Sequence, residues 1–313
     1  MHKWKIAVTA RSFALINTTP QKMLEDAGCL VMRHSAGQDI RDLLKDADGV
    51  IAGVESYTKD IFAATPRLKI ISRCGVGYDS VDLEAAKKAN VAVAITPGAN
   101  SDSVADLAMA LMLGAARFIP LLDRNIKTGT DAPRTMGFEM WQKTLGVIGT
   151  GRVGKSLIQR ASGFQMRVLC FDTVKDETFA AQYGVSYVDL DTLFRESDFI
   201  SLHAPFTPQT EKLINSASLS KMKKTAVLVN TARGGLVDEA ALTRALSEGQ
   251  IAACGLDVLV DETAYDSALC KLPNCIVLPH MGAATYEASH NMGFMAVQNL
   301  LDYLVNGKCG NLV

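Results

Sequence analysis

The sequence lacks an excess of either charge, since 32 lysines and arginines stand against 33 aspartates and glutamates. A balanced chain has no electrostatic footprint for nucleic acid or for an anionic membrane, so neither partner is expected. Long apolar runs are missing too, and none approaches the roughly 20 residues that a membrane span requires. The first apolar run ends before Arg11, which is too short for a signal peptide and typical of a first strand.

Paired cysteine patterns are also absent, because the seven cysteines are odd in number and scattered along the chain. This distribution argues against a disulfide framework and favours reduced thiols in the cytoplasm. Cys270 and Cys275 have no second pair nearby, and none of the five histidines completes a zinc pattern. We therefore expect a cytoplasmic protein without a metal site.

What is present is a repeated alternation of short apolar runs and segments of helical length. With 313 residues the chain is about twice as long as a typical domain, so two domains are expected. Five runs come first and predict a smaller parallel α/β domain. These runs are residues 6–10, 30–32, 50–52, 69–72 and 91–95.

A long apolar helix over residues 100–117 precedes a second α/β series. Its six expected strands are residues 145–148, 167–171, 199–202, 226–229, 251–256 and 276–278. Six strands fit a Rossmann-type doubly wound sheet. A last helix over 285–304 follows the completed sheet and is expected to return to the first domain. The predicted division is residues 1–99 with 285–313 against residues 100–284.

The most specific motif is a glycine turn between the strands expected at 145–148 and 167–171. Gly149 permits a tight turn, Gly151 lets the backbone approach a pyrophosphate, and Gly154 lets the helix settle on the sheet. The free N–H groups at the helix start, at Arg152 and Val153, favour phosphate. The sequence therefore predicts a dinucleotide-binding domain.

Asp172 follows the second of these strands, 18 residues after Gly154. An acid at about this spacing accepts hydrogen bonds from the adenosine ribose. It would repel a 2′-phosphate, and the next residue, Thr173, is not a cation. NAD is therefore favoured over NADP as the cofactor.

Three ionisable residues follow late strands, and carboxyl ends of parallel strands share one edge of a sheet. Arg233 offers a guanidinium fork that suits a carboxylate or a keto-acid oxygen. His280 can exchange a proton near neutral pH, and a nearby Glu262 would orient its ring. Each residue alone is also compatible with an ordinary surface role, but together beside a dinucleotide motif they indicate an active site.

At this point the chain resembles the D-isomer-specific 2-hydroxyacid dehydrogenase family over almost its whole length. The matching patterns are residues 72–79, 100–106, 149–154, 202–205, 230–239, 255–258 and 279–283. The resemblance implies a Rossmann-type NAD-binding domain and a smaller, discontinuous flavodoxin-like domain that binds substrate. Within the family it is closest to phosphoglycerate dehydrogenases, in a short form without their regulatory domain.

The resemblance also implies residue roles. His280 would protonate the carbonyl oxygen, Glu262 would hold the imidazole, and Arg233 would bind the 2-oxo acid. Backbone amides at Val76 and Gly77 would bind the substrate carboxylate, with Arg73 nearby. The remaining implied contacts are with the cofactor, at His203, Pro205, Thr231 and Asp257.

One departure bears on the substrate. Phosphoglycerate dehydrogenases tend to place an arginine after the strand at 50–52, whereas this chain reads Gly53-Val54-Glu55, which should weaken phosphate binding unless Arg73 compensates. The leading hypothesis is an NAD-dependent 2-hydroxyacid dehydrogenase with 3-phosphoglycerate as a candidate substrate. A glyoxylate or hydroxypyruvate reductase is the nearest alternative, and an NADH-sensing corepressor-like protein is a third. The apolar helix at 100–117 also predicts a homodimer.

Overall fold

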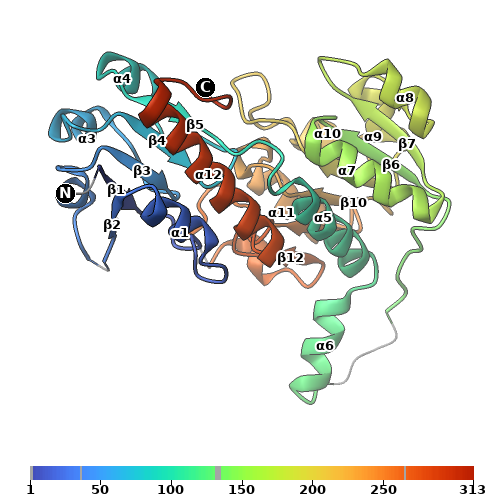
Figure 1. Ribbon diagram of the computed structural model, residues 1–313. Helices are drawn as coiled ribbons and strands as arrows, with labels where there is room; N and C mark the ends of the chain where they lie inside the picture. The colour runs from blue at the N-terminus through green and yellow to red at the C-terminus, as the bar shows by residue number, and fades with distance from the viewer. Residues whose placement is uncertain (1–2, 36, 131–134, 264–265) are drawn as a thin grey trace. The chain divides into compact units, whose positions relative to one another are not determined.

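The computed structural model describes residues 3–35, 37–130, 135–263 and 266–313, which form two compact units (Figure 1). The first unit is Met1–Asn100 with Ala284–Val313, and the second is Ser101–Ala283. The expected boundaries lie one residue from these. Each unit has its own parallel sheet, so each can be described by itself.

The first unit has a five-stranded parallel sheet in the order β2-β1-β3-β4-β5, which is the flavodoxin-like order. Its strands are β1 (Trp4–Val8), β2 (Cys29–Arg33), β3 (Gly49–Ala52), β4 (Ile70–Arg73) and β5 (Ala92–Ala94). Its helices are α1 (Thr19–Asp26), α2 (Ile40–Leu44), α3 (Lys59–Ala64), α4 (Leu83–Lys88) and α12 (Tyr286–Asn306). Strands β3 and β4 are buried throughout and lie inside this sheet. Because β1, β3 and β4 are parallel neighbours, the carboxyl ends of these three strands lie side by side.

Helix α12, the last helix of the chain, packs on the sheet of the first unit. The Ser72 hydroxyl on β4 donates to the carbonyl of Ala296 over 2.8 Å, and the Asn299 amide donates to the carbonyl of Ile95 over 2.8 Å. Leu300 packs against Gly49 on β3, where a side chain would meet it at 3.1 Å. The red helix therefore lies across the blue sheet in Figure 1 although more than 200 residues separate Ser72 from Ala296.

The second unit has a seven-stranded parallel sheet in the order β12-β11-β10-β9-β6-β7-β8. Its strands are β6 (Thr144–Ile148), β7 (Arg167–Phe171), β8 (Ser186–Tyr187), β9 (Phe199–Leu202), β10 (Val227–Asn230), β11 (Ala253–Leu256) and β12 (Cys275–Val277). The order reverses at β6, as in a Rossmann-type doubly wound sheet, which confirms the predicted fold class. The sequence predicted six strands and missed β8, a two-residue edge strand that pairs with β7.

Helices cover both faces of this second sheet. The helices of the second unit are α5 (Ser101–Ala116), α6 (Ile119–Lys127), α7 (Arg152–Ala161), α8 (Glu177–Tyr183), α9 (Leu190–Glu196), α10 (Ser216–Leu219) and α11 (Glu239–Ser247). Ten residues of α5 are buried, and the helix packs on α7, β10 and β11. The broad apolar surface of α5 is therefore covered within the unit.

Helix α6 was not expected from the sequence. The chain leaves α5 because Phe118 has a left-handed backbone with φ 52°, and Pro120 then lies in the first turn of the new helix. None of the residues of α6 is buried, and Figure 1 shows the helix projecting from the rest of its unit. Within the described part of the chain, no single helix is long and apolar enough to cross a membrane. The bent pair of α5 and α6 together has the length and composition of a span.

Candidate active site

The glycine turn after β6 has the geometry that a dinucleotide requires. Gly149 has φ 95°, and a Cβ there would lie 2.6 Å from the backbone of His203. A Cβ on Gly154 would lie 2.1 Å from the carbonyl oxygen of Gly149, so α7 can approach the turn only with glycine here. A Cβ on Gly151 would meet no atom within 4 Å, which leaves open space at the helix start.

The start of α7 is free for an anion. Gly151 is its N-cap and supplies no side-chain hydrogen bond, so the first N–H groups, at Arg152 and Val153, lack the partner that a capping side chain would give. These groups and the helix dipole favour negative charge at this point. The turn therefore fits a pyrophosphate without the use of a charged side chain.

Asp172 follows β7 and is tied to the same turn. Its Oδ2 accepts hydrogen bonds from the backbone N–H of Thr150 at 2.6 Å and from the Thr150 hydroxyl at 3.0 Å, while its Oδ1 accepts from the N–H of Val174 at 3.1 Å. Burial acts to raise the pKa of Asp172, but these hydrogen bonds outweigh it and the pKa is lowered. The group is thus a carboxylate at neutral pH. Sequence reasoning missed the part played by Thr150.

Two further predicted cofactor residues lie at the carboxyl ends of β9 and β10. The hydroxyl of Thr231 is buried and, within the part of the chain that the structure describes, has no hydrogen-bond partner. His203 bonds through Nε2 to the Ser201 hydroxyl at 2.9 Å, and burial lowers its pKa to about 4, so the ring is neutral at pH 7. Pro205 follows in an exposed loop. An unpaired buried hydroxyl at the carboxyl end of β10 fits a polar ligand that supplies its hydrogen-bond partner.

The structure brings Glu262 and His280 together from the segments after β11 and β12. The Nδ1 atom of His280 lies 2.9 Å from Oε1 and 3.0 Å from Oε2 of Glu262. The two side chains are 42% and 47% exposed, so the pair remains open to a ligand. His280 has a left-handed backbone with φ 55°, a conformation that non-glycine residues seldom adopt outside turns and functional sites.

Asp257 at the end of β11 holds this left-handed turn. Its carboxylate accepts the N–H of Met281 at 2.6 Å and that of Gly282 at 2.7 Å, and its carbonyl accepts the N–H of His280 at 2.8 Å. Burial raises the pKa of Asp257 despite these hydrogen bonds. Its predicted role was with the cofactor, and sequence reasoning did not foresee that it positions the histidine segment.

Arg233 lies in the loop after β10, the strand next to β11. Its carbonyl accepts from the Asn230 side chain at 2.8 Å, and its guanidinium donates to the carbonyl of Ala232 at 2.7 Å. A Cβ on the following residue, Gly234, would lie 2.1 Å from the backbone of Leu259, so this loop packs tightly on the segment that leads to Glu262. The loops that carry the three predicted catalytic residues thus share one edge of the sheet.

The predicted substrate residues lie in the first unit. Arg73 ends β4, is 7% exposed, and donates from Nε to the carbonyl of Gly77 at 2.9 Å. Gly75, with φ 151°, is held by the Thr96 hydroxyl at 2.9 Å. Within the described residues, the backbone N–H groups of Val76 and Gly77 donate no hydrogen bond. This braced turn therefore presents two N–H groups that can bind a carboxylate.

Glu55 after β3 lies beside this turn because β3 and β4 are neighbours, with Ala52 paired to Arg73. Its carboxylate folds back over Gly53, where a Cβ would lie 2.8 Å from Oε2. The same Oε2 is buried and, among the described residues, has no hydrogen-bond partner. An unpaired carboxylate oxygen is a strong acceptor for a donor on a ligand.

A doubly wound parallel sheet with a glycine turn, an acid after the second strand of the turn and a histidine–glutamate pair at one edge is typical of an oxidoreductase that uses a dinucleotide. The sequence model of the D-isomer specific 2-hydroxyacid dehydrogenase NAD-binding domain matches residues 109–282, more than half of the chain. The chain therefore belongs to this family, and it is an NAD-dependent oxidoreductase.

Known relatives have three different substrates in their names. A hydroxypyruvate reductase of Thermotoga maritima is 41% identical over 276 residues, which cover 87% of this chain and 89% of that protein. A D-3-phosphoglycerate dehydrogenase of Methanocaldococcus jannaschii is 40% identical over 296 residues, 93% of this chain but 56% of that longer protein. The solved structure of a glyoxylate reductase from Paecilomyes thermophila has a TM-score of 0.87 at 29% identity and covers 100% of this chain and 99% of that one. The substrate is therefore not settled by similarity.

Proposed function

We propose that the protein reduces a small, unphosphorylated 2-oxo acid to the D-2-hydroxy acid, with His280 as the proton donor and Glu262 as the residue that holds its imidazole. The observation that carries this proposal is the contact of 2.9 Å between His280 Nδ1 and Glu262. A carboxylate on Nδ1 keeps the proton of that nitrogen in place and leaves Nε2 to give a proton to the carbonyl oxygen. The Asp257 carboxylate holds the histidine turn, so the ring is positioned before substrate arrives.

The substrate's carboxylate needs donors that do not titrate. Arg233 supplies a guanidinium on the loop after β10, and the N–H groups of Val76 and Gly77 in the first unit supply neutral donors. A guanidinium beside the 2-oxo group also polarises the carbonyl bond, because it stabilises the negative charge that develops on oxygen. The first unit is thus proposed to bind substrate.

The residues for NAD form a second group. We assign the pyrophosphate to the turn from Gly149 to Gly154, the ribose to Asp172, and further polar contacts to Thr231, Asp257 and the loop from His203 to Pro205. When bound, NADH supplies the hydride that reduces the carbonyl carbon. The chain itself orients both molecules and moves the proton. The orphaned hydroxyl of Thr231 supports this assignment.

The substrate class is inferred from Glu55. A phosphate near this carboxylate would meet a like charge, whereas a neutral hydroxyl could donate to its unpaired Oε2. This favours hydroxypyruvate, which carries a hydroxyl on the carbon next to the carbonyl, over phosphohydroxypyruvate. It also favours hydroxypyruvate over glyoxylate, which has only a hydrogen in place of that carbon. Glu55 therefore separates the candidate substrates by charge and by hydrogen bonding.

The test is the rate of NADH oxidation by purified protein with hydroxypyruvate, phosphohydroxypyruvate, glyoxylate and pyruvate. We expect the highest kcat/KM for hydroxypyruvate. In Glu55→Gln, the ratio of kcat/KM for hydroxypyruvate to kcat/KM for phosphohydroxypyruvate should fall by roughly tenfold, because the negative charge is removed. Glu84→Gln on α4 should leave this ratio unchanged. No turnover of any 2-oxo acid would contradict the enzymatic proposal and favour an NADH sensor. An equal preference in wild type and Glu55→Gln would contradict only the role of Glu55.

A homodimer and a cytoplasmic location complete the proposal. All seven cysteines are free, as a reducing compartment requires. Support for the dimer comes from α6, whose Ile119 and Ile126 are 54% and 73% exposed and lie seven residues apart on one face of the helix. Exposed isoleucines on a projecting helix are apolar surface that a second subunit can cover.

A further inference from the structure

Two cysteines face each other on neighbouring strands of the second sheet. Cys254 on β11 and Cys275 on β12 are register partners, and their sulfur atoms lie 3.1 Å apart with the Cys254 thiol donating. A disulfide has an S–S length of about 2.05 Å, so about 1 Å of movement would allow the bond to form. The sheet therefore presents a dithiol that is close to bonding geometry.

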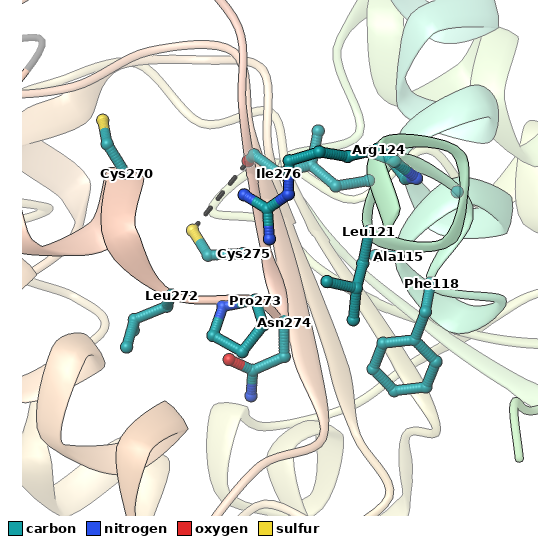
Figure 2. A pocket seen from close by; sticks show the side chains of 12 residues that line it. Ala115, Phe118, Leu121, Arg124, Cys270, Leu272, Pro273, Asn274, Cys275 and Ile276 are labelled. Atoms are coloured by element: carbon teal, nitrogen blue, oxygen red, sulfur yellow. Dashed lines mark hydrogen bonds between the residues drawn. The ribbon is translucent and has the colours of Figure 1, made fainter. Parts of the chain in front are cut away.

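One of these thiols is reachable from outside. Cys275 is partly exposed and lines a pocket of about 170 Å³, whereas Cys254 is buried. Figure 2 shows the Cys275 sulfur on the side of β12 where Cys270 lies, pointing away from Leu121 and Phe118. A small oxidant such as hydrogen peroxide fits easily, since a water-sized molecule occupies about 30 Å³. Cys275, the partly exposed cysteine of the pair, is thus the one that an oxidant reaches first.

The wall of this pocket is formed by the side of α6 that carries Pro120, Leu121 and Arg124. At 100° per residue these positions lie opposite the face with Ile119 and Ile126. A subunit covering the isoleucines would therefore leave this pocket open. Accessibility of Cys275 and a dimer through α6 are compatible.

We propose that Cys254 and Cys275 form a peroxide-oxidisable dithiol. The Cys275 thiolate attacks a hydroperoxide oxygen, the O–O bond breaks, and sulfenic acid and water are produced once the leaving oxygen takes a proton. The Cys254 sulfur then attacks the sulfenic sulfur, its proton leaves with the hydroxyl as a second water, and the disulfide forms. Two thiols are oxidised by two electrons and one hydroperoxide is reduced.

Position gives the bond a consequence for the active site. Cys254 lies three residues before Asp257, and Cys275 lies five residues before His280. Asp257 already joins the two strand ends through its bonds to Met281 and Gly282. A disulfide between Cys254 and Cys275, a few residues before Asp257 and His280, would fix the position of β11 relative to β12 along the strand direction.

The pH dependence of the second step follows from Cys254. Burial and the neighbouring Cys275 raise the pKa of the Cys254 thiol well above its usual value. The resolving sulfur is therefore protonated at neutral pH, and closure of the disulfide should become faster as the pH rises.

The experiment oxidises the purified full chain with hydrogen peroxide, alkylates the remaining thiols and identifies linked peptides by mass spectrometry. We expect a Cys254–Cys275 peptide pair that dithiothreitol removes, and faster formation at pH 9 than at pH 7. Cys275→Ser should abolish the pair. Cys270→Ser, which removes the exposed thiol of the same pocket, should retain it.

Mass spectrometry of the oxidised wild-type protein tests the proposal even if a variant fails to fold. Oxidation of Cys270 without any Cys254–Cys275 bond would overturn the proposal, because the more exposed thiol would then be the one that reacts. Formation of the bond only in urea would overturn it too, since the folded sheet would not be its cause. Neither result depends on whether the enzyme turns over a 2-oxo acid.

Discussion

Glu262 touches His280 and not the reacting atoms, so it is a positioning residue. Its carboxylate at 2.9 Å from Nδ1 favours the tautomer that presents Nε2. Glu262→Gln keeps a hydrogen-bonding group but removes the charge. We expect kcat to fall by about tenfold to hundredfold with little change in KM, because the imidazole is held less well while the groups that bind substrate are unchanged.

The control for this variant is His290→Gln in the first unit, where the imidazole only bonds to Asn17. It should leave both kcat and KM unchanged. Replacement of His280 by Gln should cost more, on the order of 100- to 10,000-fold in kcat, with little change in the Kd for NADH. A kcat of Glu262→Gln equal to that of wild type would show that the pair does not act together.

Asp172 is the residue that we propose selects NADH over NADPH. Asp172→Ala removes the carboxylate that would repel a 2′-phosphate and accept from the ribose hydroxyls. We expect kcat/KM for NADH to fall by about tenfold or more and the preference over NADPH to shrink, because a hydrogen bond to a charged group is lost. Rates with both cofactors provide the measurement. Glu177→Gln, an exposed acid on α8, is the control.

At the scale of the elements, His203 makes the stability of the second sheet depend on pH. Its folded pKa of about 4 is below its ordinary value near 6.5, so the unfolded chain binds more protons between these values. Stability contributed by the neutral ring is present above pH 6.5 and is lost as the pH falls towards 4, on the order of 3 kcal/mol in total. Urea unfolding of wild type and His203→Gln at pH 7 and pH 4.5 tests this. The variant should lose less stability on acidification, and parallel losses would refute the assignment.

Periodicity predicted most elements because it reports which face of a segment is buried. The central strands β3, β4, β9 and β10 are buried throughout, and each contains at least two consecutive apolar residues. Strand β8 was missed because two residues at a sheet edge give no period. Helix α6 was missed because the break before it depends on the left-handed backbone of Phe118, which the sequence does not announce.

The site was predictable where strand order decides it. Glu262 and His280 follow neighbouring strands, so their approach could be expected from topology alone. Contacts that depend on strand register could not be predicted in this way. The hydrogen bond from Gly282 to Asp257 and the contact between Cys254 and Cys275 depend on which residues of β11 and β12 are paired. Residue spacing does not contain that information.

At the scale of the whole molecule, the dimer was predicted from α5 but is better supported by α6. The buried residues of α5 are covered by its own unit, whereas α6 has no buried residue at all. A projecting helix gains little stability from its own chain and requires other contacts to remain ordered. A second subunit that covers Ile119 and Ile126 would supply them.

The prediction is tested by the double variant Ile119→Asp with Ile126→Asp. We expect wild type to sediment at about twice the chain mass of 33.6 kDa and the variant at the chain mass, since two charges on each subunit would have to be buried in the interface. Val174→Asp, at a 77% exposed position on the same unit, should remain a dimer. Wild type that sediments as a single chain at micromolar concentration would refute the dimer, and a dimeric double variant would move the interface away from α6.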